Sequence, residues 1–222
     1  MPHIQMAVHD DGDPSNPALR RAKRAANGRG RGSERRRELL EVATRLFYER
    51  GYASTTLQDL ADEMGFTKAA IYYYAKNKEQ LLLEIYEEIV VPATARAQEL
   101  AAGPGSGGQR FEQLVTEHLR TFLANLEVNA VFDVQSGSLS PEAKHTVQAW
   151  GRNYATILRG VYVDGVEDGT LRDLPPSVVV NSILGMCNSI HRWFNPNGST
   201  DIAQVVTSTV SLLACGYQVP EG

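Results

Sequence analysis

The sequence predicts an all-α protein in which a small three-helix domain precedes a larger helical domain, with about nine helices in total. Apolar residues recur three or four positions apart along most of the 222 residues, which is the spacing of one face of a helix. Glycine, proline and hydroxyl-bearing residues separate these stretches where helices begin and end. No stretch alternates apolar and polar residues with turns between, so no sheet is expected.

Residues 1–32 predict a disordered basic arm, because they are polar and show no apolar periodicity. Nine basic residues and one acidic residue lie between positions 20 and 37, so this stretch carries a charge of +8. The whole chain carries −4, and the remainder therefore carries −12. Such a distribution favours a polyanionic partner at the N-terminal end, although the alternative is a solvated tail with a chance cluster.

Three helices are predicted within residues 33–80, which form the first domain. Their bounds follow from apolar spacing, from threonine caps and from glycines that stop the helices: Ser33–Gly51, Thr55 or Thr56 to Gly65, and Lys68–Tyr74 after Thr67. The second and third are short and joined through a glycine, as in a helix-turn-helix whose second helix enters the major groove of DNA.

The remainder, residues 81–222, predicts further helices with short connections. The expected helices are 78–100 with a kink at Pro92, 111–126, 140–169, 175–194 and 200–215. Gly103–Gly108 is expected to be a flexible connection and residues 129–137 to be irregular.

The third helix carries side chains that suit contacts with DNA. If Ala70, Ile71 and Tyr74 face the core, the solvent face holds Thr67, Lys68, Ala69, Tyr72 and Tyr73. Lysine reaches a phosphate or a guanine edge, and tyrosine offers a hydroxyl to phosphate and a flat face to sugar or thymine. Lys78 begins the next helix, where its charge favours phosphate. The alternative interpretation is a tyrosine-rich helix that packs on a neighbour.

Residues 36–83 resemble the DNA-binding domain of the TetR family of transcriptional regulators. The resemblance extends over RRELLEVATRLFYERGYASTTLQDLADEMGFTKAAIYYYAKNKEQLLL, and one position departs from the family pattern, since Ala75 stands where Phe is usual. The resemblance implies that Thr56 and Lys78 contact phosphate and that Thr67, Lys68, Ala69, Tyr72 and Tyr73 are recognition-helix positions. A DNA role for Arg36 rests on charge alone.

The same resemblance implies a homodimer whose residues 81–222 bind a ligand and form the dimer. The last two helices would then make a four-helix bundle with the same helices of the second protomer. The two DNA-binding domains, residues 33–80 of each protomer and here called the reading heads, would bind a palindromic operator. Residues 150–216 are similar to a narrower group that regulates fatty-acid and steroid catabolism. That similarity implies a repressor that a small hydrophobic or acyl-CoA-like inducer releases from DNA. Such an inducer would be an acyl-CoA or a hydrophobic carboxylate.

Candidate ligand-binding residues are aromatic and polar side chains of the second domain. They are Phe122, Phe132, Trp150, Asn153, Tyr154, His191 and Trp193. For most of them simple packing is the plainer interpretation, and His118 is interpreted as a satisfied core histidine.

An enzyme is not predicted. The five histidines make no metal-binding pair, the GPGSGG stretch lacks the lysine of a phosphate loop, and no serine has a nucleophile-elbow context. We therefore predict no catalytic residue, no cofactor and no metal. The remaining alternative is a helical small-molecule-binding or adaptor protein that no longer reads DNA. No apolar run of membrane-spanning length occurs, and the expected compartment is the cytoplasm.

Overall fold

The computed structural model describes residues 17–219, and within them it contains nine α-helices and no strand beyond one isolated bridge between Leu171 and Gln218. The predicted all-α fold is confirmed. None of the helices described in this range is both long enough and apolar enough to cross a membrane.

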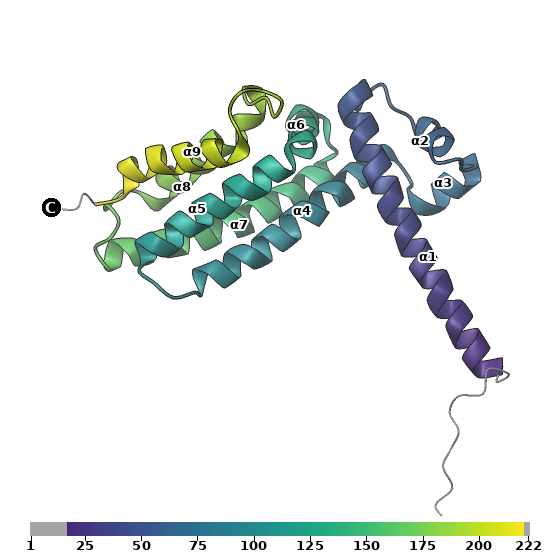
Figure 1. The fold of residues 1–222 in the computed structure, drawn as a ribbon, viewed down its shortest axis with the longest axis horizontal. Helices are drawn as coiled ribbons and strands as arrows, with labels where there is room; N and C mark the ends of the chain where they lie inside the picture. The colour runs from purple at the N-terminus through teal and green to yellow at the C-terminus, as the bar shows by residue number, and fades with distance from the viewer. Residues whose placement is uncertain (1–16, 220–222) are drawn as a thin grey trace, which may run out of the picture.

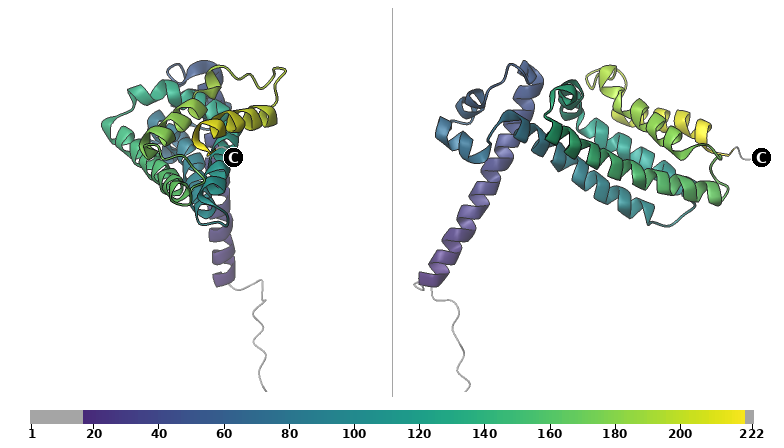
Figure 2. Two further views of the ribbon diagram at one scale, coloured as in Figure 1. Left: turned by 90° about the vertical axis from the view of Figure 1, so that its left-hand side faces the viewer. Right: turned by 180° about the vertical axis from the view of Figure 1, so that it is seen from behind.

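The N-terminal part consists of one long helix with two short helices packed beside its C-terminal half (Figure 1). The elements are α1 (Pro17–Leu46), a π-helical turn (Phe47–Gly51), α2 (Leu57–Glu63) and α3 (Lys68–Tyr74). The first half of α1 extends away from all other helices (Figure 2).

The C-terminal part is a bundle in which α5 lies against α4, α7, α8 and α9 (Figure 1). Its α-helices are α4 (Lys78–Ala101), α5 (Gly107–Ala124), α6 (Leu126–Gln135), α7 (Pro141–Glu167), α8 (Pro176–Asn188) and α9 (Ile202–Tyr217). Short 3-10 turns follow α6 at Ser136–Ser138 and α8 at Ile190–Arg192.

The threonine caps predicted for α2 and α3 are present. The Thr56 hydroxyl accepts a hydrogen bond from the Asp59 amide at 3.1 Å, and the Asp59 carboxylate accepts one from the Thr56 amide at 2.7 Å. Thr67 accepts a bond from the Ala70 amide at 3.2 Å. Pro92 lies inside α4, as expected, rather than ending it.

Three sequence-based expectations need correction. Gly107 and Gly108 begin α5 and are buried, rather than belonging to a flexible connection, because the close approach of α7 at Gly165 leaves room only for glycine. Residues 17–32 continue α1 instead of forming a disordered arm, because alanine, arginine and lysine favour a helix even where no apolar face requires one. Residues 1–16 of that predicted arm lie outside the described residues. Residues 129–137 belong mainly to α6 rather than to an irregular segment, since tertiary burial of Val131 and Phe132 stabilises a helix that local spacing does not reveal.

The molecule has two apolar cores, and the second crosses between its two parts. One core lies among α5, α7, α8 and α9. The other contains the buried side chains of α1–α3 and the N-terminal half of α4 (Leu81, Leu82 and Ile85), together with Val128, Val131 and Phe132 of α6, Leu139, and Ala143 of α7. The predicted boundary at residue 80 falls inside α4, so a continuous helix and a shared core join the two parts.

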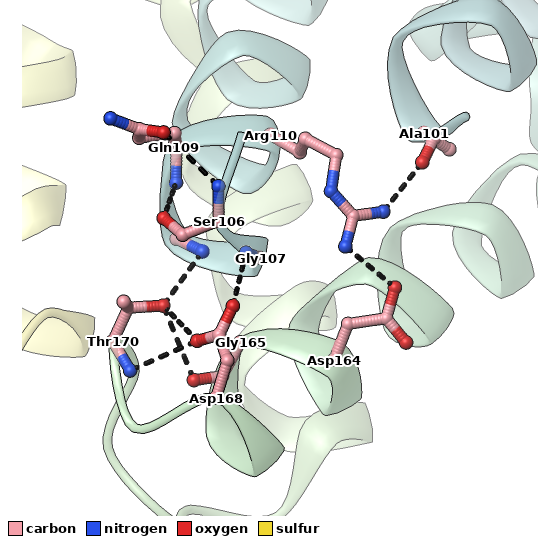
Figure 3. Close-up of polar contacts among 10 residues, drawn as sticks. Ala101, Ser106, Gly107, Gln109, Arg110, Asp164, Gly165, Asp168 and Thr170 are labelled. Atoms are coloured by element: carbon pink, nitrogen blue, oxygen red, sulfur yellow. Dashed lines mark hydrogen bonds and ion pairs between the residues drawn. The ribbon is translucent and has the colours of Figure 1, made fainter. Parts of the chain in front are cut away.

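Helices α5 and α7 approach each other closely at two glycines (Figure 3). A Cβ atom placed on Gly107 would lie 2.2 Å from the backbone nitrogen of Gly165, so no larger residue fits there without a shift of the helices. Polar contacts flank the crossing in Figure 3: the Gly107 amide donates to Asp168 at 2.6 Å, and Arg110 donates to Asp164 at 3.0 Å.

We expect Gly107→Ala to lower the free energy of unfolding by about 2 kcal/mol or more, because an overpacked helix crossing has to separate. Gly160→Ala is the matched control, since Gly160 lies on the exposed face of α7 and a Cβ there meets nothing within 4 Å. The control is expected to gain about 0.5 kcal/mol from helix propensity. Urea unfolding at one fixed protein concentration measures both; equal effects would show that the crossing is not tight.

Candidate nucleic-acid interface and ligand cavity

Helices α2 and α3 are held as a helix-turn-helix by a glycine turn. Gly65 has a φ of 64°, in the left-handed region that an L side chain rarely adopts, and the chain closes with a 2.7 Å bond from the Phe66 amide to the Ala61 carbonyl. Ile71 of α3 is fully buried against this turn and α1. Because the face of α3 that carries Ile71 is buried, the opposite face of α3 is exposed to solvent.

The outward face of α3 carries the predicted recognition positions. Tyr73 is 83% exposed and Tyr72 is 50% exposed, although both are large aromatic residues that are usually buried. Lys68, Ala69 and Thr67 are exposed beside them. Two exposed tyrosines, a lysine and a threonine on one short helix form a surface that can donate hydrogen bonds to phosphates and pack on sugars.

Two of the predicted DNA-contact residues make hydrogen bonds within the protein. The Arg36 guanidinium donates to the Tyr74 carbonyl at 2.7 Å and pairs with Glu84, which ties α1 to the end of α3 and to α4. The Lys78 ammonium donates to the Tyr52 carbonyl at 2.5 Å and lies 4.5 Å from the centre of the Tyr52 ring. Partial burial lowers the pKa of Lys78. Both residues therefore position the reading head in this structure.

The small side chain of Ala75, at the position where Phe is usual in the family pattern, is accommodated by its neighbours. Ala75 is buried at the end of α3, and Tyr74 stacks on Phe66 with ring centres 5.9 Å apart. The aromatic contact between the turn and the end of α3 is thus supplied by Tyr74. Thr56 is exposed at the start of α2, where its cap leaves it on the surface.

A cavity of about 330 Å³ lies in the C-terminal part, between α4, α5, α6, α7 and α8. Its lining residues are Tyr86, Ile89, Val90, Ala93, His118, Thr121, Phe122, Asn129, Phe132, Asp133, Ser136, Gly151, Tyr154, Leu184 and Asn188. The volume is near the lower end of the range for small-molecule sites, and the wall is mainly apolar and aromatic, as such sites are.

The structure brings three of the seven candidate ligand-binding residues to this cavity. Phe122, Phe132 and Tyr154 line it. The other four do not: Trp150 packs near Tyr86, Asn153 is exposed, His191 lies beside Asp133, and Trp193 is exposed.

Sequence reasoning missed the contribution of α4 to the cavity. Tyr86, Ile89, Val90 and Ala93 follow the spacing i, i+3, i+4, i+7 and so share one face of the helix. That spacing is visible in the sequence, but it does not say whether the face meets a packed core or an empty volume.

His118 faces both the core and the cavity. Its Nε2 lies 3.0 Å from the side-chain oxygen of Asn188, and its ring centre lies 5.5 Å from that of Tyr154. Burial lowers the pKa of His118 to about 4, although the contact with Asn188 acts in the opposite direction. The imidazole is therefore neutral near pH 7 and satisfied as predicted, while it also lines the cavity.

The cavity wall is continuous with the core of the reading head. Phe132 lines the cavity, belongs to the N-terminal core and stacks on Tyr86 of α4 with ring centres 3.9 Å apart. Close by, the Glu79 carboxylate accepts bonds from the Ser140 amide at 2.7 Å and the Ser140 hydroxyl at 2.9 Å. These contacts join the first turn of α4 to the start of α7.

The helix-turn-helix joined to a helical bundle with a cavity defines the class of protein, a helix-turn-helix transcriptional regulator. The chain belongs to the TetR family: the profile of bacterial regulatory proteins of the tetR family matches residues 39–85, and that of the tetracyclin repressor-like C-terminal domain matches residues 104–217. The family resemblance is confirmed, and the relatives are regulators rather than enzymes.

Similar proteins cover between 80% and 85% of the chain. The HTH-type transcriptional repressor KstR2 of Rhodococcus jostii is 26% identical over 190 residues, which is 85% of this chain and 93% of that protein. A TetR/AcrR-family regulator from Thermobifida fusca is 42% identical, with 84% of this chain and 100% of that one covered and a TM-score of 0.70. The structure of AibR with isovaleryl coenzyme A and operator DNA is 26% identical, with 80% and 97% covered and a TM-score of 0.67. Others are a ketosteroid transcriptional regulator of Mycobacterium tuberculosis and a fatty acid metabolism regulator protein of Bacillus subtilis.

We expect the buried neutral His118 to make folding stability depend on pH. The pKa of His118 is about 4 in the folded protein and about 6.5 in the unfolded chain, so the unfolded state binds more protons between these values. Stability therefore falls as the pH falls through this window, by about 2 kcal/mol between pH 7 and pH 5.

Chemical unfolding of His118→Gln at both pH values measures this effect, because the variant is expected to lose that part of the pH dependence. His145→Gln is the matched control, since His145 is exposed on α7, and it should behave like the parent protein. The same pH dependence in all three proteins would show that His118 is not held neutral.

Proposed function

We propose that the protein is a ligand-responsive transcriptional repressor that binds a palindromic operator as a homodimer and is released by a small hydrophobic or acyl-CoA-like inducer. The observation that carries the proposal is the exposed tyrosine and lysine face of α3, on a reading head whose core is shared with a cavity-lining helix. The relatives support it, since one is named a repressor and another was solved with both an acyl-CoA and operator DNA. A DNA-binding repressor of bacterial type works in the cytoplasm, which is the compartment we propose.

The homodimer is supported by exposed apolar side chains on α8 and α9. Val178 and Met186 of α8 are 60% and 47% exposed, and Leu212 of α9 is 68% exposed. Both helices pack on α5 through their other faces, so these side chains point away from the bundle. A second copy that covers them would place two reading heads on one duplex, and a two-fold dimer reads a palindrome.

Release by a ligand requires that the ligand distinguish the DNA-bound arrangement from another arrangement. Phe132 is placed to transmit that difference, since it lines the cavity and packs in the core of the reading head. A ligand that prefers one position of Phe132 therefore favours one position of the head relative to the bundle.

We expect Tyr73→Ala and Lys68→Ala each to weaken binding to a duplex selected by the parent protein by at least about tenfold, with the free energy of unfolding unchanged within about 0.5 kcal/mol. The reason is that both side chains are exposed and make no large contribution to the core. Tyr48→Ala is the control, because Tyr48 is also exposed but lies on the π-helical turn. Failure of the parent protein to select any sequence in the presence of salt would contradict DNA reading itself and favour a binding or adaptor role.

We expect deletion of residues 1–32 to weaken DNA binding and to lower its salt dependence while sparing sequence preference, because six basic residues between 20 and 31 are removed. The slope of log affinity against log salt should fall by up to about 5 per protomer. Deletion of residues 1–16 removes three aspartates but no lysine or arginine and is the matched control. An unchanged slope after the longer deletion would show that the basic segment does not contact DNA.

A further inference from the structure

The C-terminal end of α3 is attached to α4 through a closed ring of hydrogen bonds. The Arg36 guanidinium donates from Nη1 to the Tyr74 carbonyl at 2.7 Å and from Nη2 to the Glu84 carboxylate. The other Glu84 oxygen accepts a bond from the Gln80 side-chain nitrogen at 2.9 Å, and the Gln80 side-chain oxygen accepts one from the Lys76 amide at 3.0 Å. The ring therefore encloses the short connection between the two helices.

Arg36, Gln80 and Glu84 are here called the α3–α4 clamp. The last carbonyls of a helix have no partner within the helix, and their partial negative charge favours a cation beside them. The guanidinium of Arg36 satisfies the Tyr74 carbonyl, and Glu84 holds the guanidinium in place. The Arg36 side chain is 36% exposed and the Glu84 side chain is 21% exposed, so solvent screens this ion pair only in part.

The side chains of α3 offer limited surface for burial. Ile71 is the buried residue of this seven-residue helix, and among the neighbouring helices α3 packs mainly against α2. Tyr72 and Tyr73 are exposed, and the chain leaves the helix at Ala75 in an extended conformation. The position of the exposed face relative to α4 therefore depends on how the C-terminal end of α3 is held.

We propose that Glu84 and Gln80 are positioning residues for DNA reading, which act through Arg36 to fix the orientation of α3. The inference rests on the proposed DNA-binding function. Contacts with base edges require a fixed geometry, whereas the attraction between basic side chains and phosphates tolerates movement of the helix. Loss of the clamp therefore weakens binding to a duplex that the parent protein selects more than binding to a scrambled duplex of equal length, so the sequence selectivity falls.

The effect expected of Glu84 is opposite in sign to that of its charge, because removal of an acidic charge by itself favours binding to a polyanion. Glu84→Gln is expected to lower the selectivity at least about tenfold, since a neutral amide holds the guanidinium less firmly than a carboxylate does. Glu87→Gln is the matched control: Glu87 lies on the same helix, is exposed, and has no partner among the described residues. Equal selectivity of the two variants overturns the proposal.

Arg36→Lys separates positioning of α3 from direct contact with phosphate. Lysine keeps the charge but lacks the planar fork that reaches the Tyr74 carbonyl and Glu84 together. The selectivity is expected to fall at least about tenfold, with an unchanged slope of log affinity against log salt. The double variant with Glu84→Gln should lose no more than the larger single loss, since both changes open one ring. Selectivity like that of the parent in Arg36→Lys, or additive losses in the double variant, overturns the proposal.

Hydrogen exchange of the free full-length protein tests the clamp without DNA. The amides of residues 71–76 are expected to exchange at least about tenfold faster in Glu84→Gln than in the parent protein, with the amides of α5 unchanged. Equal exchange at 71–76 overturns the proposal, and so does faster exchange throughout the chain, which would assign Glu84 to overall stability. If exchange changes as expected but the parent protein selects no duplex, the DNA-binding function is wrong and the attachment of α3 by the clamp stands.

Discussion

The arrangement of this molecule depends on the burial of one face of α6 in the core of the reading head. The side chains that α6 contributes to this core are Val128, Val131 and Phe132, which pack with apolar residues of α1–α4. The core of a three-helix domain of this size is small, so the apolar side chains that α6 adds enlarge the buried surface that stabilises it. The same burial prevents the two parts from moving independently, since a shift of α6 repacks both.

The ring of Phe132 is shared by three environments. It packs in the N-terminal core, stacks on Tyr86 of α4 and lines the cavity. Close-packed interiors shift between discrete arrangements rather than deforming continuously, so a displacement of Phe132 would require its neighbours in the N-terminal core and in the cavity wall to repack together. The pair of bonds from Glu79 to Ser140 adds a polar connection at the same junction.

The basic residues divide into two groups whose roles a charge count does not separate. Arg36 and Lys78 donate hydrogen bonds to backbone carbonyls of the reading head. These bonds hold α3 in position relative to α1 and α4. Lys68 stays exposed on α3. The internal hydrogen bonds of Arg36 and Lys78 position α3, and Lys68 has an exposed side chain; a charge count alone does not show this difference.

The sequence by itself determined the all-α class, a threonine cap at position 55 or 56, the cap at Thr67, the bounds of α3 and the exposed face of that helix. These features are local: helix spacing, capping hydroxyls and a glycine turn act over fewer than about ten residues. Only the tertiary structure decided that residues 129–135 are helical, that Arg36 and Lys78 are engaged internally, and that Tyr86 and His118 line a cavity while Asn153 and Trp193 do not. Each of these depends on contacts between helices far apart in the chain, and apolar spacing marks a buried face without saying what that face meets.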